Sequence, residues 1–251
     1  MIDDPCLACG APGKPGAAFC VACGTPMSGL GAQPARPGLR EGWDDFRTAL
    51  KLYGALLAVQ VVGGIAFHLK AAMFPVLVFE TAAFAFVVAV AAFARRDLAW
   101  PPLGRAGFGL LGFGAILLAS PLVVGAVGLY VRALATTFGL TMPKELEGFE
   151  AHGLPWAIFL IAIAPPLVEE LAFRGVIQGA LRRHLGLPET LLLQGFAFAI
   201  LHLSVPSLIT HLPLGLYFGW LAARSGSLWP GVFAHFCHNL GVVIAERQGW
   251  L

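Results

Sequence analysis

The chain has 251 residues, of which 58% are hydrophobic and only 12% are charged. Soluble globular proteins carry about a quarter of charged residues, so the composition predicts a protein with several helices in a membrane and excludes an ordinary soluble domain. A formal net charge of +2, with basic residues scattered along the chain, also excludes a nucleic-acid-binding surface.

The first 28 residues contain two Cys-x-x-Cys pairs, in the stretches CLACG and FCVACG. Two such turns can direct four thiolates at one zinc ion with tetrahedral geometry. We therefore expect residues 1–28 to form a small structural zinc ribbon, with two disulfides in an exported segment as the alternative. The predicted zinc ligands are Cys6, Cys9, Cys20 and Cys23.

Residues 29–42 are rich in Gly, Pro and Arg and lack periodicity, which predicts a flexible linker. The remainder, residues 43–251, is predicted to be an all-α transmembrane helix bundle. A helix needs about 20 apolar residues to cross a bilayer, and stretches of about this length predict seven spans. They lie near residues 49–69, 71–93, 107–130, 155–180, 189–203, 207–223 and 228–245.

The first forty residues hold no apolar core of a signal peptide, so we expect the N-terminus to stay on the side where it is made. With seven spans, ten basic residues then fall on the inner side and four on the outer side, as the positive-inside rule requires. The inner ones are Arg36, Arg40, Arg47, Lys51, Arg95, Arg96, Arg105, Arg182, Arg183 and Arg224. Because the predicted zinc ribbon precedes the first span, this count places it in the cytosol.

The fourth predicted span contains three ionisable residues, in the stretch PPLVEELAFRG. A charged side chain at membrane depth costs about 3 kcal/mol or more, so such residues are candidates for function. Glu170 and Arg174 are four residues apart and should pair on one helix face. Glu169 lies about 100° around the helix and is left as a free carboxylate, or as a second structural one.

Two later spans carry further polar groups in FAFAILHL and FAHFCHNLG. His235 and Asn239 are four residues apart and share a helix face, and His202 ends an apolar helix. A carboxylate, two imidazoles and an amide are sufficient to activate a water molecule and to stabilise an oxyanion. The structural alternatives are a helix-capping role for His202 and interhelical hydrogen bonds for the other two.

The motifs EELAFRG, FAILH and HFCHN resemble those of the CPBP family of intramembrane proteases. This family includes the CAAX prenyl endopeptidase of the Ras-converting type and bacterial bacteriocin-processing homologues. The resemblance covers about residues 155–245 and implies a protein of the bacterial inner membrane that cleaves a peptide or protein substrate. The N-terminal ribbon is an addition to the family pattern.

The resemblance also implies a role for each motif residue. Glu169 would be the general base, and His202 would help to activate the water. The oxyanion hole would be formed by His235 and Asn239, while Glu170 and Arg174 would support the site.

Other functions remain open at this point. In a metalloprotease, Glu169, His202 and His235 would bind a catalytic zinc ion, although no His-Glu-x-x-His motif is present. In a proton-coupled transporter, the same residues would line a pathway, and in a noncatalytic scaffold the ribbon would bind a partner. The substrate could be a prenylated C-terminus, a leader peptide or a segment of a membrane protein.

Overall fold

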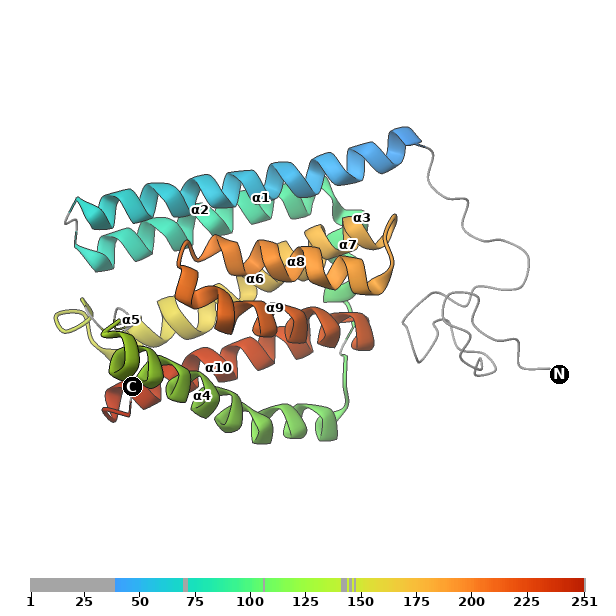
Figure 1. Ribbon diagram of the computed structural model, residues 1–251. Helices are drawn as coiled ribbons and strands as arrows, with labels where there is room; N and C mark the ends of the chain where they lie inside the picture. Colours follow the sequence, from blue (N-terminus) through green and yellow to red (C-terminus); the bar gives the residue numbers. More distant parts are fainter. Residues whose placement is uncertain are drawn as a thin grey trace.

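The computed structural model describes residues 39–69, 72–105, 107–140, 144, 146 and 148–250, with side chains from residue 43 onward. The predicted zinc ribbon lies outside these residues. Within them the chain is all-helical, as predicted, and contains no strand (Figure 1). The first helices are α1 (Leu39–His68), α2 (Met73–Ala94), α3 (Arg96–Leu103) and α4 (Leu110–Phe138).

The fourth predicted span is one continuous helical rod, residues 154–182, built from α-helical and π-helical segments. These are α5 (Leu154–Ala157), η1 (Ile158–Ile163), α6 (Ala164–Glu170), η2 (Leu171–Ile177) and α7 (Gln178–Arg182). Three helices follow, α8 (Leu187–Leu201), α9 (Val205–Ser225) and α10 (Trp229–Arg247). Glycines in the left-handed conformation end two of the helices, Gly139 after α4 (φ 65°) and Gly226 after α9 (φ 64°).

Among the described residues, four helices are long and apolar enough to cross a bilayer. They are Trp43–His68, Met73–Ala94, Leu110–Phe138 and Leu154–Arg182, which match the first four predicted spans. Helix α8 is apolar but shorter. The α8, α9 and α10 helices run alongside the rod in alternating directions (Figure 1), and the count of seven spans stays a prediction.

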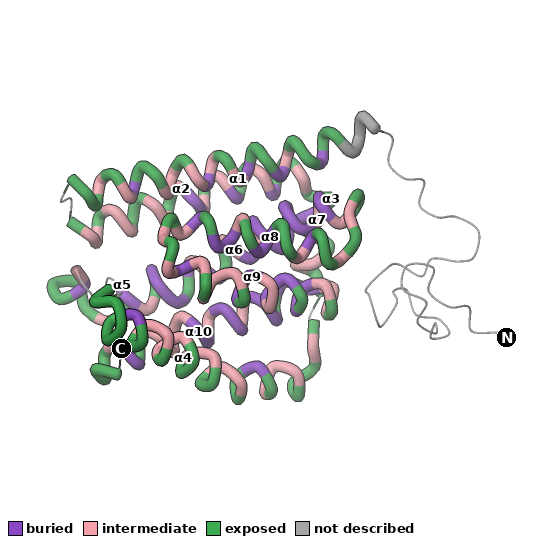
Figure 2. Tube along the Cα trace, viewed as in Figure 1, coloured by how far each residue is buried: buried purple, intermediate pink, exposed green. Residues whose placement is uncertain are grey.

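The bundle has its most buried segments in the middle. The α1–α2 hairpin covers one side of the rod, and α4 packs against α10 on the other side (Figure 1). The main apolar core lies between this hairpin, η2 and α8. Figure 2 shows buried residues concentrated along the rod, α8 and α10, while α4 exposes large apolar side chains such as Leu110 and Leu118. Such a surface is suited to lipid.

Helices α8 and α9 approach each other closely because both carry glycine at the contact. A Cβ atom on Gly215 would lie 3.0 Å from the Cα atom of Gly195, so a side chain there would push the helices apart. Small residues serve this purpose in membrane helix pairs. The contact fixes the position of the α8–α9 turn relative to the rod.

A network of ion pairs joins the start of α1, the α2–α3 junction and the end of α7. Asp45 pairs with Arg95, with Arg183 (3.3 Å) and with His184 (2.9 Å). Asp97 pairs with Arg95 (3.0 Å) and Arg183 (2.7 Å). Hydrogen bonding from Arg95, opposed in part by desolvation, lowers the pKa of Asp97 to about 2. The network places three helix ends together, as alternating spans require.

Candidate active site

The motif residues lie where the rod, α8 and α10 meet near the centre of the bundle. Each is carried by the helix that the sequence predicts. Glu169 and Glu170 are the last residues of α6, and Arg174 follows in η2. His202 is the C-cap of α8, and His235 and Asn239 lie in α10.

Glu170 is the centre of a fully buried polar cluster. Its Oε1 atom accepts a hydrogen bond from Arg174 Nη1 at 3.0 Å and one from His235 Nδ1 at 3.0 Å. The side chains of Glu170 and Arg174 are both 0% exposed. Helix α10 comes close enough for this contact at Gly231, where a Cβ atom would lie 2.9 Å from Glu170 Oε2. The pair expected from the sequence therefore has a third member, His235.

Arg174 also connects the rod to the α8–α9 hairpin. Its Nη2 donates to the carbonyl oxygen of Gly215 at 3.1 Å, and its guanidinium carbon lies 4.6 Å from the ring centroid of Phe198. Gln194 Nε2 donates to the same Gly215 oxygen at 2.8 Å. A buried cation needs such compensation in an apolar interior, so this arginine is part of the packing between helices.

Glu169 has a different environment from its neighbour. Its side chain is only partly buried, and the hydrogen bonds and ion pairs that reach the acidic pair from the described residues all go to Glu170 Oε1. It nevertheless lies close enough to His235 for a charge interaction. The structure thus leaves this carboxylate available for a water molecule or a substrate.

His202 caps the end of α8 and is held by its own helix. Its Nδ1 atom lies 3.0 Å from the carbonyl oxygen of Phe198. Because a carbonyl only accepts, Nδ1 carries the hydrogen and Nε2 of the neutral ring keeps its lone pair. The Phe198 ring contacts the rings of His202 (5.2 Å between centroids), His211 (6.2 Å) and His235 (5.9 Å), so three imidazoles surround one aromatic side chain.

Asn239 contacts the rod at a different point from His235. Its Nδ2 donates to the carbonyl oxygen of Ile161 at 2.9 Å. In an α-helix that oxygen would accept from residue 165, and in a π-helix from residue 166, but both residues are proline and have no N–H. Asn239 therefore satisfies an orphaned carbonyl, which is the interhelical role that the sequence left as an alternative. Its second amide hydrogen remains for another acceptor.

The sequence assigns no role to His211, which the structure places against His202. It falls on no motif position, and motif matching alone could not find it. The available signal was its place as an ionisable residue inside the apolar stretch LITHLPLG.

A catalytic zinc ion would need three or more ligands with converging side chains. Among the described residues, no group of three or more His, Cys, Asp or Glu side chains is placed to hold a metal ion. His235 and His202 each use only Nδ1 in their contacts with Glu170 and with the Phe198 carbonyl, and this arrangement is also usual for histidines that bind a metal through the other ring nitrogen. The catalytic zinc ion therefore stays an alternative.

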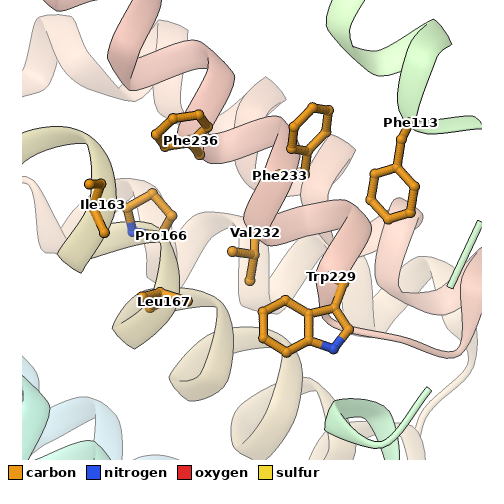
Figure 3. A pocket seen from close by; sticks show the side chains of 8 residues that line it. All are labelled: Phe113, Ile163, Pro166, Leu167, Trp229, Val232, Phe233 and Phe236. Atoms are coloured by element: carbon orange, nitrogen blue, oxygen red, sulfur yellow. The ribbon is translucent and has the colours of Figure 1, made fainter. Parts of the chain in front are cut away.

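An apolar groove of about 370 Å³ lies beside these residues, between the rod, α10 and the start of α4. Figure 3 shows Ile163, Pro166 and Leu167 on the rod facing Val232 and Phe236 on α10. The remaining lining residues are Phe113, Trp229 and Phe233. Pro166 precedes the acidic pair by one helical turn and Phe236 follows His235, but none of the six motif residues lines the groove.

The part of the chain that carries the three motifs is similar to known proteins. Residues 151–241 match the model of the family described as type II CAAX prenyl endopeptidase Rce1-like. YdiL of Bacillus subtilis (strain 168), provisionally named a membrane peptidase, is 30% identical over 138 residues. The alignment covers 53% of each protein, so the chain spans about half the length of this relative. No solved structure matches the chain. Residues 151–241, which contain all three motifs, are therefore the part of this chain that resembles the Rce1-like CAAX prenyl endopeptidases.

Proposed function

We propose that the protein is an intramembrane endopeptidase that hydrolyses a peptide bond with a water molecule activated by Glu169 and His202. The contrast between adjacent carboxylates carries this proposal. Glu170 is fully buried, and its Oε1 accepts from Arg174 and His235 while its Oε2 has no partner among the described residues, whereas the contacts that reach this pair leave out Glu169 beside it. A free carboxylate in an apolar site is suited to general-base catalysis.

In the proposed reaction the water donates one hydrogen bond to the Glu169 carboxylate and the other to His202 Nε2. Glu169 takes the proton as the water oxygen attacks the peptide carbonyl carbon, which gives a tetrahedral intermediate. The same proton then passes to the leaving nitrogen, and the C–N bond breaks. His202 orients the water and remains neutral.

The oxyanion of the intermediate would accept hydrogen bonds from Asn239 and His235. Asn239 has its second Nδ2 hydrogen for this purpose, because the first is used by Ile161. The Nδ1–H of His235 faces Glu170, so this ring can donate from Nε2 only as an imidazolium. The buried Glu170 carboxylate would stabilise that cation.

The substrate is proposed to be a peptide attached to an apolar group or segment, since the groove beside the site has an almost wholly apolar lining. A prenylated C-terminus, a leader peptide and a membrane-protein segment share this chemistry. An apolar part in the groove would bring the peptide bond next to Glu169.

The test uses the full chain purified and reconstituted in liposomes, with one fluorogenic peptide of each of these three kinds. Wild-type protein should cleave at least one of them, and Glu169→Gln should remove cleavage while the protein stays folded. Glu189→Gln, a change at an exposed glutamate of α8, is the matched control and should leave cleavage intact. Full activity of Glu169→Gln would refute the proposal.

A further inference from the structure

The rings of His211 and His202 are in close, tilted contact across the α8–α9 turn. Their ring centroids are 3.7 Å apart, and the ring planes are inclined by 35°. The two residues belong to different helices, so the contact depends on the packing of the hairpin. One face of the His202 ring is therefore covered by the His211 ring.

One hydrogen bond within α8 holds the His202 ring, at the point where the helix ends. His202 is the C-cap of α8, and Leu203 after it has a positive φ of 50°. Helix ends fray, and a leucine is rarely found in this region of backbone conformation. Among the described residues, His202 has one side-chain hydrogen bond, to the Phe198 carbonyl, and ring contacts with Phe198 and His211.

His211 is itself fixed by its helix. Its Nδ1 atom lies 3.0 Å from the carbonyl oxygen of Ser207 and 3.1 Å from the hydroxyl of Thr210. Ser204 caps the start of α9 by accepting a hydrogen bond from the Ser207 amide at 3.4 Å. The first turn of α9 thus connects the α8–α9 loop to the ring that covers His202.

We propose that His211 is a positioning residue, which holds the His202 ring so that its Nε2 lone pair faces the water beside Glu169. The catalytic consequence rests on the function proposed above, while the effect on the His202 ring does not. This ring contact requires a flat ring at position 211 and not an imidazole as such.

The kinetic test compares His211→Ala, which removes the ring, with His211→Phe, which keeps a flat ring without its nitrogens. A displacement of about 1 Å in a catalytic group can reduce rate by about a hundredfold, so His211→Ala should lower kcat by roughly ten- to a hundredfold with KM nearly unchanged. His211→Phe should restore most of the loss. His68→Ala, at an exposed histidine of α1, is the control.

A second measurement follows the His202 ring directly. In protein with ¹⁵N-labelled histidine, the His202 signals are assigned by their loss in His202→Gln. Wild-type protein and His211→Phe should show one sharp Nδ1–H tautomer, and His211→Ala should show broadened or mixed signals. Unchanged His202 signals in His211→Ala, or equal disturbance in both variants, would overturn the proposal. Wild-type protein that cleaves no substrate but shows this pattern would refute only the proposed function.

Discussion

Adjacent glutamates in α6 allow the same substitution to be made in two environments. Glu170→Gln keeps the shape of the side chain but removes a charge that balances Arg174, and the side chains of both residues are 0% exposed. Glu169→Gln makes the same chemical change at a partly exposed side chain, and the hydrogen bonds and ion pairs of the acidic pair are made by Glu170. We expect the first to destabilise the fold and the second to affect the reaction alone.

The magnitude follows from what Glu170 contacts. Breaking a buried ion pair by removing one partner costs about 3–5 kcal/mol, because the other charge stays buried. His235 also loses its anionic acceptor, which favours the upper end of the range. Since 1 kcal/mol changes Tm by about 2–4 °C in a chain of this size, Glu170→Gln should lower Tm by about 6–20 °C. Glu169→Gln should not lower Tm, because it leaves no buried charge without its partner.

The assay is thermal unfolding of both variants in the same detergent, together with Arg174→Met and the double variant Glu170→Gln/Arg174→Met. Removing the arginine as well removes the unbalanced charge, so the double variant should be less destabilised than the sum of the two single ones. Equal Tm changes at the two glutamates, or strict additivity in the double variant, would refute the assignment of Glu170 to structure and Glu169 to chemistry.

The remaining predictions concern an interhelical contact, the ion-pair network and the cysteine-rich segment. Asn239→Ala leaves the Ile161 carbonyl without a donor and should cost about 1–3 kcal/mol of stability, as measured by thermal unfolding. The pKa of Asp97 is lowered from 3.8 to about 2, so its stabilising effect should be complete above pH 4 and should be lost as the pH falls towards 2. Tm should fall less steeply over this interval in Asp97→Asn. Deletion of residues 1–28 should remove about one zinc ion per chain, as measured by elemental analysis, with cleavage retained.

Each of these has an outcome that contradicts it. Asn239→Ala with unchanged stability would mean that water or another group satisfies the carbonyl. If Tm fell equally with pH in wild-type protein and in Asp97→Asn, the ion-pair network would not be the cause of the loss of stability in acid. A zinc content unaffected by the deletion would place the metal elsewhere in the chain.

Much of the site could be predicted from local spacing. Glu170 and Arg174 are four residues apart within one helix, so the geometry of a single helix determines that they meet. The spans with the clearest signals, such as Met73–Ala94, are long apolar runs whose length alone predicts a membrane helix. The spacing of two residues on one helix and the length of one apolar run can each be read from a short segment of the sequence.

The contacts between helices could not be predicted in this way. The hydrogen bond from His235 to Glu170 depends on the close approach at Gly231, and the ring contact of His211 with His202 depends on the α8–α9 packing. The bond from Asn239 to the rod could have been suspected from the two prolines, which leave a carbonyl without a partner. The sequence does not say which helix supplies that partner.

The orphaned carbonyl of Ile161 also has a consequence for biogenesis. In a chain without α10, the Ile161 carbonyl would lack the donor that Asn239 supplies, and an unsatisfied peptide oxygen is costly in hydrocarbon. Docking of α10 would then complete the hydrogen bonding of the rod and bring His235 to Glu170 in the same event. A nascent chain that stops short of its last helix would carry this defect.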